Sequence, residues 1–199
     1  ETDEVFHKVL TLIFDRNTAN KYKLMNDDEK ISFISKVNFA NKKTLYSDKD
    51  LTNTLGSIDA MKLIQKSNGQ AGSHRYIISH NQSPLNVLEV FNMFLFTGWA
   101  KPSVDIVPLF ETINDLKISE SVMDKVYKNR LYQNHLKRRN NKQIIMLGFS
   151  DGTKDGGYFT ANWNILKAKE GLIRVSKKYG IEVKFFDGRG GPPARGGGN

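Results

Sequence analysis

Short apolar runs rich in β-branched residues recur along the last two thirds of this chain, and they constrain its fold more than any other feature. The four runs are residues 76–79, 104–110, 143–148 and 181–186. Each has the length of a strand buried in a sheet, and each ends at polar or turn-forming residues. We therefore expect four buried β-strands.

Helical patterns separate these runs. They lie at residues 87–95, 122–127 and 161–179, with starts expected at Ser83 or Asn86 and at Ser119, and stops at Gly98 and Gly180. Strands that alternate with helices imply parallel pairing through crossover helices. From residue 75 onward the chain is therefore predicted to be α/β.

The first 70 residues have a different pattern. Helical periodicity covers residues 4–15, 27–38 and 50–67, and no convincing strand is present. We expect residues 1–70 to be helices that pack outside the sheet. The chain starts and stops abruptly within its patterns, so we also expect it to be a piece of a longer enzyme.

Charged side chains follow the predicted strands at the points where the strands end. Glu111 follows the second strand, Asp151 and Lys154 follow the third, and Arg189 and Arg195 follow the fourth. Parallel strands present their carboxyl ends at one edge of the sheet, where α/β proteins bind ligands. These five side chains are therefore expected to share one rim.

Two carboxylates facing arginines suggest a magnesium-bound anion. Glu111 and Asp151 could hold Mg²⁺, while Arg189, Arg195 and the glycine-rich backbone around them bind phosphate or carboxylate. A second interpretation stays open: Glu111 caps the next turn, Asp151 forms an Asx turn and Lys154 is a solvated lysine. We expect Asp155 to cap or begin a helix.

The four histidines give no pair at the spacing of metal ligands. His80, after the first strand, is expected to be a hydrogen-bonded loop residue, although a substrate contact stays open. The other three, His7, His74 and His135, are expected to be structural or at the surface.

The aromatic side chains are expected to belong to the core rather than to a stacking platform. Phe91, Phe94 and Phe96 have near-helical spacing. Trp163 is expected to pack its helix on the sheet, with a place in the pocket as the alternative.

Composition excludes several classes of function. The net charge is +9, from 30 Lys and Arg against 21 Asp and Glu, but the excess is scattered lysine, with one compact basic run at residues 137–139. The chain has no cysteine, hence no disulfide, thiol nucleophile or cysteine zinc site. No apolar run has spanning length, because the segment 87–99 is short and carries Glu89 and Asn92. A soluble cytosolic protein is the default.

The repeated Arg-Gly-Gly at residues 189–191 and 195–197 leaves an RNA-binding module as one alternative. Such arginine-glycine segments are long and disordered. Here the repeat follows an apolar strand and contains the stiff pair Pro192 and Pro193, which disfavours that interpretation.

Three motifs in order resemble phosphoenolpyruvate carboxylase of the bacterial type. They are residues 107–112, 148–157 and 186–198, and residues 76–79 and 84–88 are similar to the strand and helix that precede them in that family. The resemblance covers residues 70–199. It implies that residues 71–199 are four strands of a (β/α)₈ barrel within a longer, mostly helical enzyme that is usually a homotetramer.

The resemblance also implies an activity and a set of roles. The family converts phosphoenolpyruvate and bicarbonate to oxaloacetate and phosphate, through carboxyphosphate and an enolate, with Mg²⁺ or Mn²⁺. By motif, Glu111 and Asp151 are the metal ligands, and Lys154 lies beside the metal and helps to hold anionic substrate. On the catalytic loop, Arg189 and Arg195, with the backbone of Gly190 and Gly191, bind phosphate, bicarbonate or carboxyphosphate. The arginine that matches Arg195 is drawn away by aspartate in inhibited members, so that position is also a candidate for regulation.

This chain departs from the family pattern in two ways. Many members have histidine where this chain has Asp187, and we expect Asp187 to orient Arg189 instead. The family's catalytic histidine in a Thr-Ala-His-Pro motif is not in these 199 residues, so the chain alone is predicted to be inactive. Another metal-dependent barrel lyase or phosphotransferase acting on a small phosphorylated acid remains the enzymatic alternative.

Overall fold

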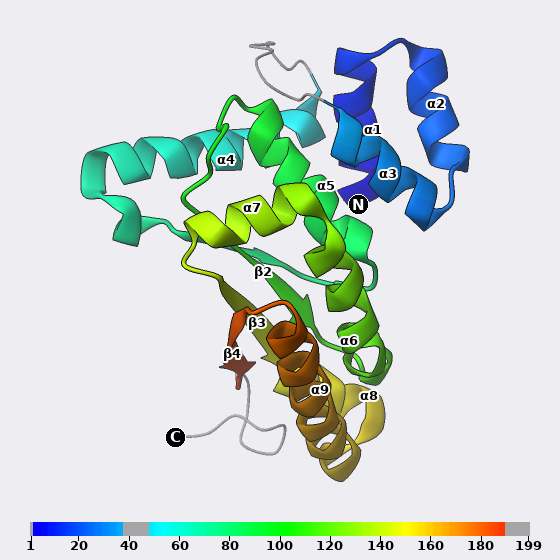
Figure 1. Ribbon diagram of the computed structural model, residues 1–199, viewed down its shortest axis with the longest axis vertical. Helices are drawn as coiled ribbons and strands as arrows, with labels where there is room; N and C mark the ends of the chain where they lie inside the picture. Colours follow the sequence, from blue (N-terminus) through cyan, green and yellow to red (C-terminus); the bar gives the residue numbers. More distant parts are fainter. Residues whose placement is uncertain (1, 38–47, 190–199) are drawn as a thin grey trace. The chain divides into compact units, whose positions relative to one another are not determined.

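The computed structural model describes residues 2–37 and 48–189 and contains a four-stranded parallel sheet (Figure 1). The sheet has the order β1-β2-β3-β4, and every neighbouring pair is parallel. Its strands are β1 (Arg75–Ile78), β2 (Asp105–Phe110), β3 (Lys142–Gly148) and β4 (Glu182–Gly188). All four strands were predicted within two residues, and the α/β fold class is confirmed as part of a β/α barrel.

The two faces of the sheet have different surroundings. On one face Ile106, Ile145 and Leu147 are buried, because alternate residues of a strand point to the same side. The helices that follow β2 and β3 in the chain pack against strands of the sheet. On the other face Ile77 is 49% exposed and Phe186 51% exposed. Strands of parallel sheets are normally covered on both faces, as the inward face of a complete barrel would be.

The connecting helices are α5 (Pro84–Phe96), α6 (Ile113–Lys128), α7 (Arg130–Arg138), α8 (Phe149–Gly156) and α9 (Tyr158–Lys178). Figure 1 shows α6 and α9 side by side, and the ion pairs Arg174–Glu120 and Lys178–Asp124 join them. The predicted helix start at Ser119 is wrong. Thr112 caps α6 in a reciprocal capping box with Asp115, and Ser119 is buried in the helix interior.

The described residues before β1 are helical, as predicted, with α1 (Thr2–Ile13), α2 (Arg16–Leu24), α3 (Asp27–Lys36), α4 (Lys49–Asn68) and the short 3₁₀ helix η1 (Gln70–Gly72). The sequence did not indicate α2, because only Ala19 and Tyr22 of its nine residues are buried and it has no apolar stripe. Asp15 caps it by accepting from the Thr18 amide at 2.8 Å.

The chain divides into two compact units. Residues Glu1–His74 and Leu88–Val104 form one, called here the helical unit, and residues Arg75–Val87 and Asp105–Asn199 form the other, called the sheet unit. The predicted boundary between residues 1–70 and 71–199 stays a prediction.

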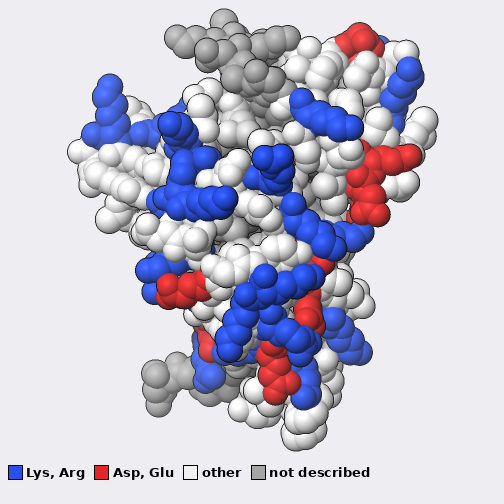
Figure 2. Space-filling view, in the orientation of Figure 1, with Lys and Arg blue, Asp and Glu red and all other residues white. Residues whose placement is uncertain are grey.

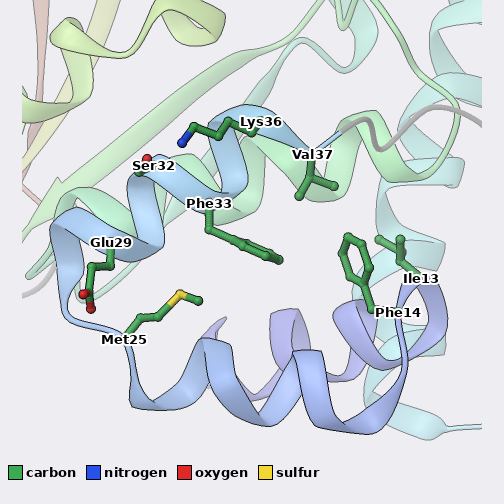
Figure 3. Close-up of a pocket in the computed structure, with 8 residues that line it drawn as sticks. All are labelled: Ile13, Phe14, Met25, Glu29, Ser32, Phe33, Lys36 and Val37. Carbon is green, nitrogen blue, oxygen red and sulfur yellow. The ribbon is translucent and has the colours of Figure 1, made fainter.

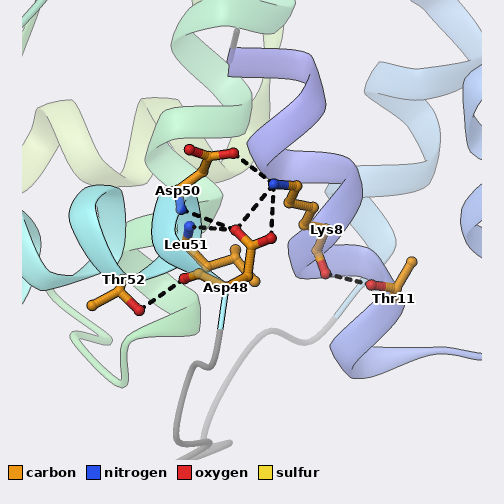
Figure 4. Close-up of polar contacts among 6 residues, drawn as sticks. All are labelled: Lys8, Thr11, Asp48, Asp50, Leu51 and Thr52. Atoms are coloured by element: carbon orange, nitrogen blue, oxygen red, sulfur yellow. Dashed lines mark hydrogen bonds and ion pairs between the residues drawn. The ribbon is translucent and has the colours of Figure 1, made fainter.

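Ion pairs and a pocket mark the surface of the helical unit. Lys8 on α1 donates to both oxygens of Asp48 at 3.0 and 2.9 Å and to Asp50 at 2.6 Å, and thereby joins α1 to the start of α4 (Figure 4). Phe14, Phe33 and other side chains of α1 to α3 line an open pocket of about 650 Å³ (Figure 3). The pocket is mainly apolar and brings no set of reactive groups together.

Basic side chains are visible over much of the face shown in Figure 2. On the face shown in Figure 2 they alternate with uncharged and acidic areas rather than forming one strip. None of the helices in the parts that the structure describes is long and apolar enough to cross a membrane. The phenylalanines Phe91, Phe94 and Phe96 are buried, which confirms their assignment to the core.

Candidate functional site

Glu111 lies directly after β2 and is held by the end of the neighbouring strand β1. The backbone N–H of His80 donates to Glu111 Oε1 at 2.8 Å. His80 has a φ of 50°, in the left-handed region that few residues other than glycine occupy, so the turn after β1 aims its amide at the carboxylate. The second oxygen, Oε2, accepts no hydrogen bond from any described residue. Glu111 is thus fixed on one side and available on the other.

Two glycines bring the third strand's end against Glu111. A Cβ at Gly148 would lie 3.0 Å from Glu111 Cα and 3.4 Å from its Cβ, and a Cβ at Gly152 would lie 3.4 Å from the Glu111 carbonyl oxygen. These approaches leave little room for larger residues. Because Asp151 precedes Gly152, the first turn of α8 lies beside Glu111.

Asp151 lies in the first turn of α8 rather than in the loop or Asx turn that was considered. Lys154 Nζ donates to Asp151 Oδ1 at 2.9 Å, and both side chains are about half exposed. Lys154 is therefore paired but still half exposed, so the alternative of a solvated surface lysine stays open. Asp155 accepts from the Ile113 amide at 2.9 Å and so caps α6, as a capping role for this residue predicted.

Arg189 is exposed and directly follows β4, the strand that pairs with β3. It therefore lies at the same carboxyl edge of the sheet as Glu111 and Asp151. Its guanidinium carbon lies 4.6 Å from the centre of the Phe149 ring, and its backbone N–H donates to the Asp187 carbonyl at 2.9 Å. The carboxylate of Asp187 has a different partner from the one expected: Lys169 Nζ lies 2.8 Å from Oδ1 and 3.1 Å from Oδ2. Asp187 thus contacts Arg189 through its backbone carbonyl and Lys169 through its carboxylate, and the expectation that Asp187 orients Arg189 stays a prediction.

The remaining predicted loop residues, Gly190, Gly191 and Arg195, lie outside the described residues. Their expected roles stay predictions. The described part of the site therefore consists of Glu111, Asp151, Lys154 and Arg189, all at the carboxyl edge of the sheet.

Glu111 and Asp151 carry carboxylate oxygens, the type of ligand atom that a magnesium ion takes. Within residues 2–37 and 48–189 no group of three or more His, Asp or Glu side chains could hold a metal by itself. Magnesium is commonly held by one or two carboxylates and completes its shell with water and substrate oxygens. The uncommitted Oε2 of Glu111 and the exposed carboxylate of Asp151 supply ligands of that kind.

Other candidates from the sequence have structural roles or none in the site. His80 contributes its amide, His74 Nδ1 lies 3.1 Å from the Ala71 carbonyl, and His135 is buried. Trp163 is 53% exposed, with Lys167 5.1 Å from its ring centre, so the expectation that it packs α9 on the sheet is wrong.

Sequence reasoning missed two residues near Arg189. Phe149 was taken as part of a motif without a role, and Lys169 as one of many scattered lysines. A signal existed for Phe149, since an aromatic residue directly after a strand and beside a predicted anion site is a natural partner for a guanidinium group. Nothing in the sequence indicated the Lys169–Asp187 pair, which joins positions 18 residues apart.

Parallel strands alternating with helices, with charged side chains at the carboxyl edge, place the molecule in the β/α-barrel class of proteins. Comparison with known families narrows that class. The family model for phosphoenolpyruvate carboxylase matches residues 1–199, and the chain belongs to that family.

Curated relatives agree with the family match. The chain is 34% identical to a phosphoenolpyruvate carboxylase of Nitrosomonas europaea over 98% of its own length and 22% of the relative's. It is 34% identical to that of Corynebacterium glutamicum over 100% of its length and 23% of the relative's, and 37% identical to that of an Azoarcus species over 77% and 17%. The chain thus spans less than a quarter of the length of these relatives.

Proposed function

We propose that this chain is the part of a phosphoenolpyruvate carboxylase that carries the metal carboxylates and the catalytic-loop arginines. The full-length enzyme would convert phosphoenolpyruvate and bicarbonate to oxaloacetate and phosphate. The supporting observation is that Glu111, Asp151 and Arg189 occupy the carboxyl edge of one parallel sheet in a chain matched along its whole length by the family model. A cytoplasmic homotetramer is proposed for the full-length protein by analogy with the family.

Glu111 and Asp151 would hold Mg²⁺ or Mn²⁺. When bound, such an ion draws negative charge from a substrate oxygen as the enolate develops. The His80 amide keeps Glu111 in one orientation, and Lys154 restrains Asp151. Fixed ligands need no reorganisation when charge develops, which lowers the barrier of the reaction.

Arg189 and Arg195 would bind the anionic substrates and the phosphoryl group in transfer. A guanidinium group presents parallel N–H donors that match phosphate and carboxylate oxygens. The backbone amides of Gly190 and Gly191 would add donors at close range. Lys154 would contribute a further positive charge beside Asp151. In the full-length protein, exclusion of water from the site would lower the dielectric constant and strengthen each of these charge interactions.

Bicarbonate-dependent formation of oxaloacetate by the full-length protein tests the proposal. Asp151→Asn and Arg195→Ala should each lower kcat/KM on the order of a hundredfold or more, since each removes charge that stabilises the transition state. Glu170→Gln serves as the matched control, because Glu170 is an exposed carboxylate of α9 whose described partner is Lys167. If the protein forms no oxaloacetate with Mg²⁺ and phosphoenolpyruvate, or if both site variants keep full activity, the proposed function is wrong.

A further inference from the structure

The ring of Phe149 lies close to two cationic side chains, those of Arg189 and Lys169. The Arg189 guanidinium carbon is 4.6 Å from the centre of its ring, and Lys169 Nζ is 6.0 Å from the same centre. Phe149 is the first residue of α8, Lys169 belongs to α9, and Arg189 follows β4. Three separate elements therefore meet at this ring, which is only 5% exposed.

A guanidinium group held over an aromatic ring suits an arginine that binds an anion. An aromatic ring interacts with the flat face of a guanidinium group, whereas the N–H donors point outward in its plane. The contact with Phe149 thus restricts the side chain and leaves its donors for a ligand. A restricted side chain loses less conformational entropy when the ligand binds.

Lys169 has a different role from Arg189, because its charge is already matched. Its ammonium group lies 2.8 and 3.1 Å from the two oxygens of Asp187 and 5.5 Å from the Phe185 ring centre. Both partners of the pair are about 30% exposed, with 28% for Lys169 and 31% for Asp187. The pair is therefore partly shielded from solvent and fixes the end of β4 to α9.

The backbone between this pair and Arg189 has little freedom. The Arg189 N–H donates to the Asp187 carbonyl at 2.9 Å. Between them, a Cβ at Gly188 would lie 3.0 Å from Met146 Cε and 3.1 Å from the Leu147 carbonyl oxygen. An ion pair that fixes Asp187 consequently also fixes the position of the Arg189 backbone.

We infer that Phe149 and the Lys169–Asp187 pair are positioning residues that hold Arg189 ready for an anionic substrate at the carboxyl edge of the sheet. Phe149 restricts the guanidinium group, and the ion pair anchors the backbone while it neutralises the carboxylate of Asp187, two residues before Arg189. This inference rests on the proposed role of Arg189 and adds residues that act through it.

The first test removes the ring in the full-length protein. Phe149→Leu should raise KM for phosphoenolpyruvate or bicarbonate by about threefold to thirtyfold, the range that corresponds to the loss of one cation–π contact, with a smaller change in kcat. Phe149→Tyr keeps the aromatic ring, so its KM should stay close to that of the parent. Phe159→Leu is the matched control, since Phe159 is an aromatic residue of the sheet unit that is 82% exposed, and it should leave KM unchanged.

A double-mutant cycle with Arg189→Met separates this inference from the proposed function. If Phe149 acts through Arg189, Phe149→Leu should have no further effect on KM once Arg189 is replaced. Equal effects of Phe149→Leu in both backgrounds would refute the positioning role while leaving the function of Arg189 intact. Full activity of Arg189→Met itself would instead refute the proposed function of Arg189.

The ion pair gives a second test that does not depend on the folding of a Phe149 variant. Lys169→Met leaves the Asp187 carboxylate unneutralised beside the anion site and should raise KM for the anionic substrates about tenfold. Lys169→Met combined with Asp187→Asn removes that charge and should recover most of the loss. Lys167→Met is the control, because Lys167 lies on the same helix and pairs with Glu170. Equal KM values for the single and double variants would overturn the role of the pair.

Discussion

The helical unit and the sheet unit differ in the surroundings of their carboxylates: one is buried, the other exposed and paired with a lysine. In the helical unit, Glu89 of α5 is 1% exposed and accepts a hydrogen bond from Tyr22 at 2.7 Å. In the sheet unit, Asp151 is about half exposed and paired with Lys154. Burial raises the pKa of Glu89 to about 8, even though the hydrogen bond from Tyr22 opposes the shift.

This difference teaches that a strongly shifted pKa does not mark the functional site in this chain. A perturbed titratable group in a cleft is a reasonable pointer to catalysis. Glu89, however, faces Tyr22, Asp3 and Lys30 inside a helix bundle that holds none of the predicted substrate contacts. The carboxylates proposed for the metal are instead recognisable by their place at the ends of parallel strands.

The largest expected effect concerns pH and the helical unit. The folded state keeps Glu89 protonated, while the unfolded chain ionises near its usual pKa of 4.5. The contribution of protonated Glu89 to the free energy of unfolding is therefore complete below about pH 4.5 and is lost as the pH rises through about 8. The free energy of unfolding should fall by roughly 3–5 kcal/mol over this range. Denaturant unfolding between pH 5 and 8.5, together with hydrogen exchange of amides in the helical unit, measures the slope with which the free energy of unfolding changes with pH.

Glu89→Gln is the control for that slope, since the amide is neutral at every pH and close in shape to the protonated acid. The variant should lose most of the pH dependence in this range. A variant with an unchanged slope would show that Glu89 is ionised in the folded protein and would remove the contrast between the two units.

The next effect in size concerns activity and the sheet unit. Glu111→Gln keeps a carbonyl oxygen for the His80 amide but removes the charge proposed for the metal. We expect oxaloacetate formation by the full-length protein to fall on the order of a hundredfold, with little change in the free energy of unfolding. Steady-state kinetics and Mg²⁺ titration measure the loss.

Glu182→Gln is the matched control, because Glu182 is an exposed carboxylate of β4 that lies near Lys142 and Lys184. It should leave both activity and metal dependence unchanged. If Glu111→Gln behaved like this control, the proposal that Glu111 binds the metal would be wrong.

A smaller effect concerns the donor that holds Glu89. Tyr22→Phe removes the hydroxyl and leaves a buried carboxyl without that partner, at a cost of about 1–2 kcal/mol in the free energy of unfolding. Because the hydrogen bond from Tyr22 lowers the pKa of Glu89, its loss should raise that pKa. The fall in the free energy of unfolding should then extend to higher pH. Tyr158→Phe, at a tyrosine that is 60% exposed, should change neither property. Equal stability of the two variants would show that this hydrogen bond contributes nothing.

The same contrast explains which features could be predicted from the sequence. The strands were predictable because their apolar runs are short and end in polar residues, and strand ends then gave Glu111, Asp151 and Arg189 as one edge. Helix α8 was not, because Gly152, Gly156 and Gly157 within or beside it are typical of a loop. Its helical geometry depends on packing against the Glu111 backbone, which is a tertiary contact.

Partners were less predictable than positions. Glu89 was noted only as a charge that interrupts an apolar segment, and its pairing with Tyr22 spans 67 residues. The pairing of Lys169 with Asp187 likewise depends on how α9 packs beside β4. A carboxylate in a sequence does not reveal whether it will be buried and neutral or exposed and paired, since the helix or strand that packs against it decides.

The smallest effect has the opposite sign and belongs to the sheet unit. Asp124 of α6 accepts from Lys178 at 2.7 Å and from the Tyr179 hydroxyl at 3.0 Å, and the hydrogen bond from Lys178 lowers its pKa to about 2. This stabilisation is complete above the usual pKa of 3.8 and is lost as the pH falls through about 2. Because the pair is partly exposed and screened by solvent, we expect only about 1 kcal/mol. Unfolding of parent and Asp124→Asn between pH 2 and 5 measures it, and 1 M NaCl should weaken the difference. Parallel profiles for the two proteins would show that the sheet unit gains nothing from this pair, and the contrast in sign between the units would then rest on Glu89 alone.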